Sequence, residues 1–266
     1  MEPRIDPTPV VVEVPHAGLE LDPEALATLA APARALGADA DLYVDELYAD
    51  APDAGAALVA SRVSRYVCDL NRAETDVDPL AVEGGTARSS PHGLVWRTTT
   101  EGRPALLGAV SSAEYQRRLE RYYRPYHRRI AELLEERRAR YGFAIILCAH
   151  SMPSRGRDGH DDAGVERADI VPGTRGRSTA AAPVIAAVEQ LAAASGLRLR
   201  HDEPYRGGFT TAHYGRPRDG IHAIQIELAR RLYMDERTLA KRPAQFETLR
   251  AFCKKVVQEL GTLKLG

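Results

Sequence analysis

Apolar residues along the chain form short runs that alternate with segments of helical spacing. The runs rich in β-branched residues predict strands at 9–14, 56–61, 65–70, 143–147, 197–201 and 222–227. Apolar positions three and four residues apart predict helices at 23–36, 41–50, 112–141, 179–194 and 235–260. Strands that alternate with helices predict an α/β fold with a mostly parallel, mixed central sheet and helices on both faces. We expect a single domain over 1–266.

Composition and charge narrow the class of protein. With 44% hydrophobic and 27% charged residues, the chain is typical of globular proteins, and a net charge of -1 gives no reason to expect a polyanionic partner. Cys68, Cys148 and Cys253 have no paired spacing, which favours a reducing compartment. The N-terminus lacks the apolar segment of a signal peptide, and no apolar run approaches the roughly 20 residues of a membrane span. We expect a cytoplasmic protein with no membrane partner, and we leave its oligomeric state open.

The segment 112–141 is dense in arginine, which raises the question of nucleic-acid binding. Its glutamates interleave with the arginines at spacings of three and four residues, which is typical of a solvated, ion-paired helix face. We therefore expect no nucleic-acid partner. Pro125 is expected to kink or divide this helix.

Two histidines and several acids suggest a metal-dependent hydrolase. His16 and His150 each follow a predicted strand, and the carboxyl ends of parallel strands meet at one edge of a sheet. A hydrolytic zinc centre needs about three protein ligands, a position for water and a separate carboxylate base. The third ligand must come from elsewhere, and the candidates are Asp41, Asp45 and Glu46. Helical spacing does not decide which of them turns inward.

Glu227 is the candidate base. It ends the apolar run 221–226, so it should be partly desolvated, and its pKa should be raised as general acid–base catalysis requires. A structural role is the alternative, because Glu227 could pair with Arg230 or Arg231. In the same way, His16 could be a simple turn residue, and the acids at 45 and 46 could interact with a helix dipole. These residues alone support a possible metallohydrolase.

Seven blocks of sequence resemble the N-formylglutamate amidohydrolase family. They are VPHAG at 14–18, VDELY at 44–48, SRYVCDLNR at 64–72, HSMPS at 150–154, DIVPG at 169–173, PYRGGF at 204–209 and HAIQIE at 222–227. The blocks occur in the order of the family, and DLNR, HSMPS and PYRGG are specific in combination. The resemblance spans most of the chain.

This resemblance implies a fold similar to that of zinc-dependent carboxypeptidases and zinc N-acetylmuramoyl-L-alanine amidases, a phosphorylase-like three-layer sandwich. It implies His16, Asp45 or Glu46, and His150 as ligands of Zn²⁺ or another divalent transition metal, with Glu227 as catalytic carboxylate. The implied reaction converts N-formyl-L-glutamate to formate and L-glutamate in histidine degradation. The alternatives are an amidohydrolase for another N-acyl amino acid and a non-catalytic zinc-binding member.

An acidic N-acyl amino acid carries two carboxylates, so its pocket needs fixed cations. Arg forms a bidentate pair with a carboxylate, and glycines let backbone N–H groups approach a ligand. The candidate substrate-binding residues are Asn71, Arg72, Ser151, Arg175, Arg206, Gly207, Gly208 and His213.

Position 148 departs from the family, whose members commonly have an acid two residues before the His of HSMPS. Here that residue is Cys148. If the acid steadies the imidazole, its loss should weaken metal binding or be compensated elsewhere. Cys148 could also be a nucleophile beside His150, but we favour a buried, protonated thiol.

Overall fold

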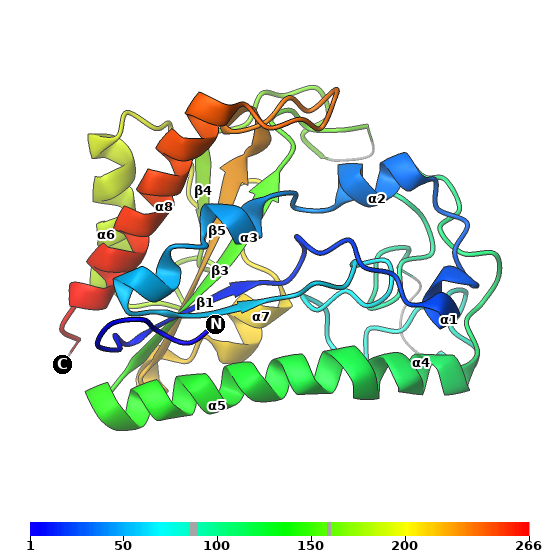
Figure 1. Cartoon of the computed structure of the whole chain (residues 1–266), viewed down its shortest axis with the longest axis horizontal. Helices are drawn as coiled ribbons and strands as arrows, with labels where there is room; N and C mark the ends of the chain where they lie inside the picture. Colours follow the sequence, from blue (N-terminus) through cyan, green and yellow to red (C-terminus); the bar gives the residue numbers. More distant parts are fainter. Residues whose placement is uncertain (86–89, 159–160, 266) are drawn as a thin grey trace. The chain divides into compact units, whose positions relative to one another are not determined.

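The computed structural model describes residues 1–85, 90–158 and 161–265 (Figure 1). The chain forms two compact units built from interleaved segments. Unit 1 comprises Met1–Val14, Tyr43–Val59 and Ile130–Gly266, and unit 2 comprises Pro15–Leu42 and Ala60–Arg129. The expectation of one catalytic domain over 1–266 stays a prediction.

Unit 1 is built on a five-stranded sheet of order β2-β1-β3-β5-β4. The strands are β1 (Val10–Val14), β2 (Ala57–Ala60), β3 (Ala144–Met152), β4 (Ile170–Gly173) and β5 (Ile221–Ala229). β3 is parallel to both β1 and β5, and β4 is antiparallel to β5. Every residue of β1, β3 and β5 is buried, as expected for strands covered on both faces. The predicted mostly parallel, mixed sheet is confirmed.

The strand predictions at 9–14, 56–61, 143–147 and 222–227 are confirmed, with one important change. β3 continues to Met152, because 150–152 pair in register with 227–229 of β5. His150 therefore lies within β3, whereas we expected it to follow the strand.

The predictions at 65–70 and 197–201 are wrong. Residues 65–68 form a turn in which Val67 and Cys68 donate to Ser64, and Leu199 forms only an isolated bridge. β4 was not predicted because Pro172 and Gly173 are rare in strands, but the sheet edge tolerates them.

The helices of unit 1 cover both faces of this sheet (Figure 1). The helices of this unit are α3 (Val44–Leu47), the part of α5 (Arg124–Tyr141) from Ile130 onward, α6 (Ala182–Ala194), α7 (Phe209–Tyr214) and α8 (Pro243–Thr262), with short 3-10 turns at Ala51–Ala54, Pro217–Asp219 and Arg230–Leu232. Gln225 accepts a hydrogen bond from Gly208 before α7, whereas His222 accepts one from Ala181 before α6. Residues three apart on a strand point to opposite faces, so α6 and α7 lie on opposite sides.

Unit 2 contains α1 (Pro23–Leu26), α2 (Ala33–Asp39) and α4 (Ser112–Arg118). The single helix predicted at 23–36 is two helices, because Pro32 interrupts it and takes the N-cap position of α2. The prediction at 112–141 is confirmed as one unbroken helical run: α4, a π turn over Leu119–Tyr123, and α5 (Arg124–Tyr141). Pro125 does not divide it, since the wider π turn just before it relieves the clash of the proline ring with the preceding carbonyl.

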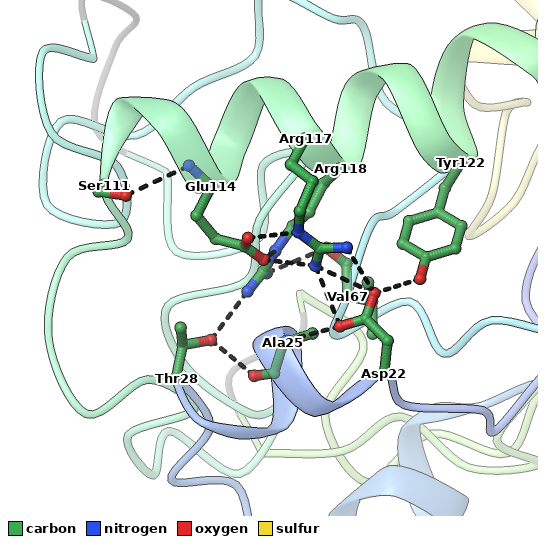
Figure 2. A network of polar contacts seen from close by, with 9 residues as sticks. All are labelled: Asp22, Ala25, Thr28, Val67, Ser111, Glu114, Arg117, Arg118 and Tyr122. Carbon is green, nitrogen blue, oxygen red and sulfur yellow. Dashed lines mark hydrogen bonds and ion pairs between the residues drawn. The ribbon is translucent and has the colours of Figure 1, made fainter.

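The arginines of α4 are less exposed than the sequence indicated. Figure 2 shows the network that they form with α1. Arg118 is 0% exposed and donates to Glu114, Thr28 and the carbonyl of Val67, at 2.8, 2.8 and 3.1 Å. Arg117 forms a bidentate pair with Asp22, which also caps α1 and accepts a hydrogen bond from Tyr122. The solvated face expected at 117 and 118 is therefore a buried ion-pair network that fastens α1 to α4.

Of the described helices, none combines the length and apolar character that crossing a membrane requires.

Candidate active site

His16 lies two residues after the end of β1 and is 3% exposed. Its Nε2 lies 2.7 Å from Oδ1 of Asp69, and its Nδ1 lies 3.5 Å from Oδ2 of Asp41. The backbone fixes the second neighbour as well, because the N–H of Asp41 donates to the carbonyl of His16 at 2.9 Å. The two ring nitrogens of His16 therefore face two different carboxylates.

Asp69 is a fully buried carboxylate with several donors. Besides His16, it accepts hydrogen bonds from Arg65 at 2.7 Å, Trp96 at 2.9 Å and the N–H of Asn71 at 2.9 Å. Burial alone would raise the pKa of Asp69, but the charges of Arg65 and His16 and the hydrogen bond from His16 outweigh it and hold the pKa well below its usual range. Because Asp69 is an ionised acceptor, it favours a proton on Nε2 of His16, and Nδ1 is the ring nitrogen that faces Asp41.

His16, Asp41 and His150 are all buried, and their potential ligand atoms lie within 4.8 Å of one another. Two ligands at about 2.0–2.1 Å from a tetrahedral zinc ion lie about 3.3 Å apart. The 3.5 Å between Nδ1 of His16 and Oδ2 of Asp41 is close to that value. This group of two imidazoles and one carboxylate could bind a metal ion.

The structure groups Asp41, and neither Asp45 nor Glu46, with the two imidazoles. Asp45 and Glu46 lie on α3, where Glu46 forms an ion pair with Lys241 and is half-exposed, and burial raises the pKa of Asp45. The helix predicted from residue 41 begins only at 44, after Tyr43 adopts a left-handed backbone with φ 67°. Helical periodicity therefore does not extend back to Asp41, and the assignment of Asp45 or Glu46 as a ligand stays a prediction of the resemblance.

His150 and Glu227 are direct neighbours on β3 and β5 and are 3% and 6% exposed. Paired residues of parallel strands point to the same face, so both side chains lie on the α7 side of the sheet. Gln225 connects Glu227 to α7: its Nε2 donates to Oε1 of Glu227 at 2.9 Å, and its own oxygen accepts from the N–H of Gly208 at 2.8 Å. Gln225 was not predicted as a candidate site residue, although its position two residues before Glu227 on the strand places it on the same face.

Cys148 is fully buried, and burial raises the pKa of its thiol well above the ordinary value. The hydroxyl of Thr210 donates to Sγ at 3.6 Å, and Glu13 of β1 is its register neighbour and hydrogen-bond partner. A protonated, enclosed thiol is what we expected, rather than a nucleophile. A buried acid, Glu13, therefore lies beside Cys148 on the adjacent strand.

The candidate substrate-binding residues fall into separate groups. In unit 2, Arg72 has a buried Nε for which the described residues offer no hydrogen-bond partner. In unit 1, the exposed Arg175 donates from Nη1 to the carbonyl of Gly207 at 3.0 Å and from its backbone N–H to the carbonyl of Arg206 at 2.8 Å. A Cβ on Gly173 would lie 2.7 Å from the nitrogen of Gly207, so glycine at 173 is what lets this segment lie on β4.

His213 and Ser151 are placed differently from one another. His213 is exposed near the end of α7 and stacks on Phe209 with ring centroids 4.9 Å apart; burial and the charge of Arg216 lower its pKa. Ser151 lies within β3, so it points to the face opposite His150, and its hydroxyl accepts from Nε of Arg230 at 3.2 Å. Its placement on the far face separates Ser151 from the group formed by His150 and Glu227.

Similarity to known proteins identifies the family of this chain. The profile of the N-formylglutamate amidohydrolase family matches residues 8–234. The chain belongs to the N-formylglutamate amidohydrolase family. Two curated relatives, both named N-formylglutamate deformylase, are 36% identical to it. The protein of Pseudomonas aeruginosa aligns over 256 residues, 95% of this chain and 92% of its own length, and that of Pseudomonas putida over 232 residues, 86% and 82%.

The fold is also that of a solved family member. The crystal structure of N-formylglutamate amidohydrolase from Ralstonia eutropha JMP134 superposes with a TM-score of 0.88 at 29% identity, covering 98% of this chain and 95% of that one. The family resemblance and the predicted α/β fold class are both confirmed.

Proposed function

We propose that this protein hydrolyses the formyl amide of N-formyl-L-glutamate to formate and L-glutamate, a reaction of histidine degradation. Two relatives that align with most of the chain carry the name N-formylglutamate deformylase. The observation that carries the proposal is the orientation of His16, whose Nε2 is held by Asp69 while Nδ1 faces Asp41. A histidine fixed in this way by a carboxylate is typical of metal ligands.

The proposed metal ligands are His16, Asp41 and His150, with Zn²⁺ or another divalent transition metal as the ion. Two imidazoles and one carboxylate are a donor set typical of catalytic zinc sites, which keep a further position for water. When bound, such a metal lowers the pKa of its water to about 7 and polarises the acyl oxygen. Asp41 takes the place that the resemblance gave to Asp45 or Glu46.

The proposed base is Glu227, which removes a proton from the attacking water and delivers it to the departing amine. Gln225 supports this role because its amide N–H donates to Oε1 of Glu227 at 2.9 Å and so helps to orient the carboxylate. Gln225 is in turn fixed by the N–H of Gly208, so the carboxylate has a defined orientation before substrate binds.

The proposed contacts for the two substrate carboxylates are Arg72 with Asn71, and Arg206 with Arg175 and the backbone of Gly207 and Gly208. The buried Nε of Arg72 needs an acceptor, and a substrate carboxylate would provide one. His213 remains a candidate for lining the substrate pocket. We assign Ser151 to the support of Arg230 instead.

The proposal is tested by formate release from N-formyl-L-glutamate and by the Glu227→Gln variant. General acid–base catalysis contributes typically about 10²–10⁴-fold, so this variant should lose that much turnover while keeping its fold and its metal. Glu46→Gln is the matched control, because it changes the same group on a half-exposed residue outside the metal group, and it should retain activity.

Near-normal turnover of the Glu227→Gln protein would remove Glu227 from the mechanism. Faster formate release from other N-formyl amino acids than from N-formylglutamate would indicate a different N-acyl substrate. A folded protein that holds metal but releases no formate from any of them would indicate a non-catalytic family member.

A further inference from the structure

A cavity lies at the amino-terminal edge of the sheet in unit 1, at the opposite end of the strands from His150 and Glu227. It has a volume of about 830 Å³, and its lining includes His222, Arg218, Lys264, Ala181, Pro183 and Phe143. His222 is the second residue of β5, and Glu227 follows five residues later on the same strand. At about 3.3 Å per residue, the two lie about 16 Å apart along β5.

His222 presents an unused hydrogen-bond donor at this cavity. Its side chain is 5% exposed, and its Nδ1 accepts the N–H of Ala181 at 3.2 Å. Burial lowers the pKa of His222, so the ring is neutral and its single proton lies on Nε2. Among the residues that the structure describes, no hydrogen-bond partner accompanies Nε2, whose natural complement is an oxygen acceptor from a ligand.

The start of α6 adds positive potential at the same place. This helix has 13 residues, its N-cap is Ala181, and no side chain caps it. Ala181 and Pro183 both line the cavity, so the positive end of the helix dipole is directed toward it. The helix terminus and the imidazole N–H therefore favour the same kind of ligand, one that is negatively charged.

The charges around the cavity leave two cations available. Arg138 is already paired with Glu135 at 2.7 Å, and Asp219 lies 3.7 Å from Arg216. Arg218 and Lys264 are exposed, and within the described part of the chain neither forms an ion pair. Phe143, Pro183 and Pro217 provide apolar surface beside these cations.

We infer that this cavity is a second ligand site, separate from the metal group, for a small molecule carrying a phosphate or carboxylate. One oxygen of the anion accepts the Nε2–H of His222, and Arg218 and Lys264 balance its charge at the rim. The site does not depend on the reaction proposed above.

Calorimetric titration of the whole protein with inorganic phosphate and with succinate tests this inference, since the two probes separate the two oxyanion chemistries. We expect saturable binding of at least one probe, weakened at least tenfold in the double variant Arg218→Ala/Lys264→Ala and in His222→Phe. The control Arg103→Ala/Lys255→Ala removes the same charge from exposed positions outside the cavity and should bind like the wild type.

If replacement of the buried His222 impairs folding, the variant Arg218→Ala/Lys264→Ala still tests the inference, because both of its residues are exposed. Absence of binding of both probes at tens of millimolar would overturn the inference. Equal affinity of the wild type and the double variant would also overturn it, because binding would then occur elsewhere, as at the metal group.

Discussion

Unit 2 contains two networks of charged residues. They contain similar residue types, but their charges are paired differently. The network around Asp22 joins Arg117, Arg118, Glu114 and Tyr122, and each charge in it meets an opposite charge within the network (Figure 2). The network around Asp69 holds Arg65 and Trp96 on one carboxylate oxygen and one nitrogen of His16 on the other. The second nitrogen of His16 faces a further carboxylate, Asp41, at 3.5 Å.

This difference separates the network that joins α1 to α4 from the one that includes the proposed metal ligands. In the first, the positive and negative groups neutralise each other and hold α1 on α4. In the second, buried acids on both sides of one imidazole bring negative charge together, and a cation would relieve it. The density of charged residues therefore does not by itself identify a candidate site, and the placement of two carboxylates beside one imidazole is what distinguishes the second network.

The largest effect on stability is expected from Arg118→Ala. Removing one partner of a buried ion pair typically costs about 3–5 kcal/mol, because the remaining groups stay buried without compensation. Chemical denaturation should show this loss, with metal content unchanged in the folded protein. Arg121→Ala on the same helical run is the control: the side chain is exposed, and the change should stay within about 0.5 kcal/mol. Equal stability of the two variants would contradict the structural role of the network.

Asp69→Asn should weaken metal binding about 10–100-fold, the usual effect of losing the partner that orients a ligating histidine. The measurement is a competition titration with a coloured chelator. Asp22→Asn makes the same chemical change in the other network and should leave metal affinity at the wild-type value. If Asp69→Asn also binds metal as tightly as the wild type, Asp69 does not orient His16.

Arg72→Ala tests the buried Nε of Arg72, for which the described residues offer no hydrogen-bond partner. Loss of a charged hydrogen bond to substrate should raise KM for N-formylglutamate at least tenfold, about 1.4 kcal/mol, with a smaller change for N-formylalanine. Steady-state kinetics with the two substrates measure this ratio. An unchanged preference between them would remove Arg72 from substrate recognition.

The smallest expected effect is the acid dependence of the Asp22 network. Burial acts to raise the pKa of Asp22, but hydrogen bonds from Arg117 and Tyr122 outweigh it and lower the pKa from 3.8 to about 2. A carboxyl group whose pKa is depressed on folding stabilises the protein above its unfolded pKa and loses that contribution as the pH falls. The stability difference between wild type and Asp22→Asn should therefore be constant above pH 5 and should shrink between pH 4 and pH 2. A difference that does not change with pH would contradict the assigned shift.

The sequence predicts the sheet better than the site. β1, β3 and β5 each contain a run of apolar residues that predicts the strand, and His16 and His150 are the histidines that follow the first two of these runs. The carboxylates depend on contacts that periodicity does not contain. Asp41 is positioned by the left-handed backbone at Tyr43, and Asp69 is positioned by partners as distant in sequence as Trp96.

The charged helix at 112–141 is a second case in which the sequence predicts the element but not the packing of its side chains. Its interleaved charges are typical of a solvated face, and the sequence correctly predicts the helix and the ion pairs. Burial of Arg118 depends on packing against Val67 and Thr28, which the local pattern does not report. The spacing of charged residues therefore predicts which of them form ion pairs, but it does not predict whether those pairs are buried.

The central claim is that His16, Asp41 and His150 bind one divalent metal ion. Mass-spectrometric metal analysis of protein purified without chelator tests it most directly, on the wild type and on His16→Ala, with His213→Ala as the matched control for loss of an imidazole. The account predicts about one equivalent of zinc or another transition metal per chain in the wild type and the control, and loss of that metal in His16→Ala. Metal-free wild-type protein with full formate release, or undiminished metal in His16→Ala, would contradict it.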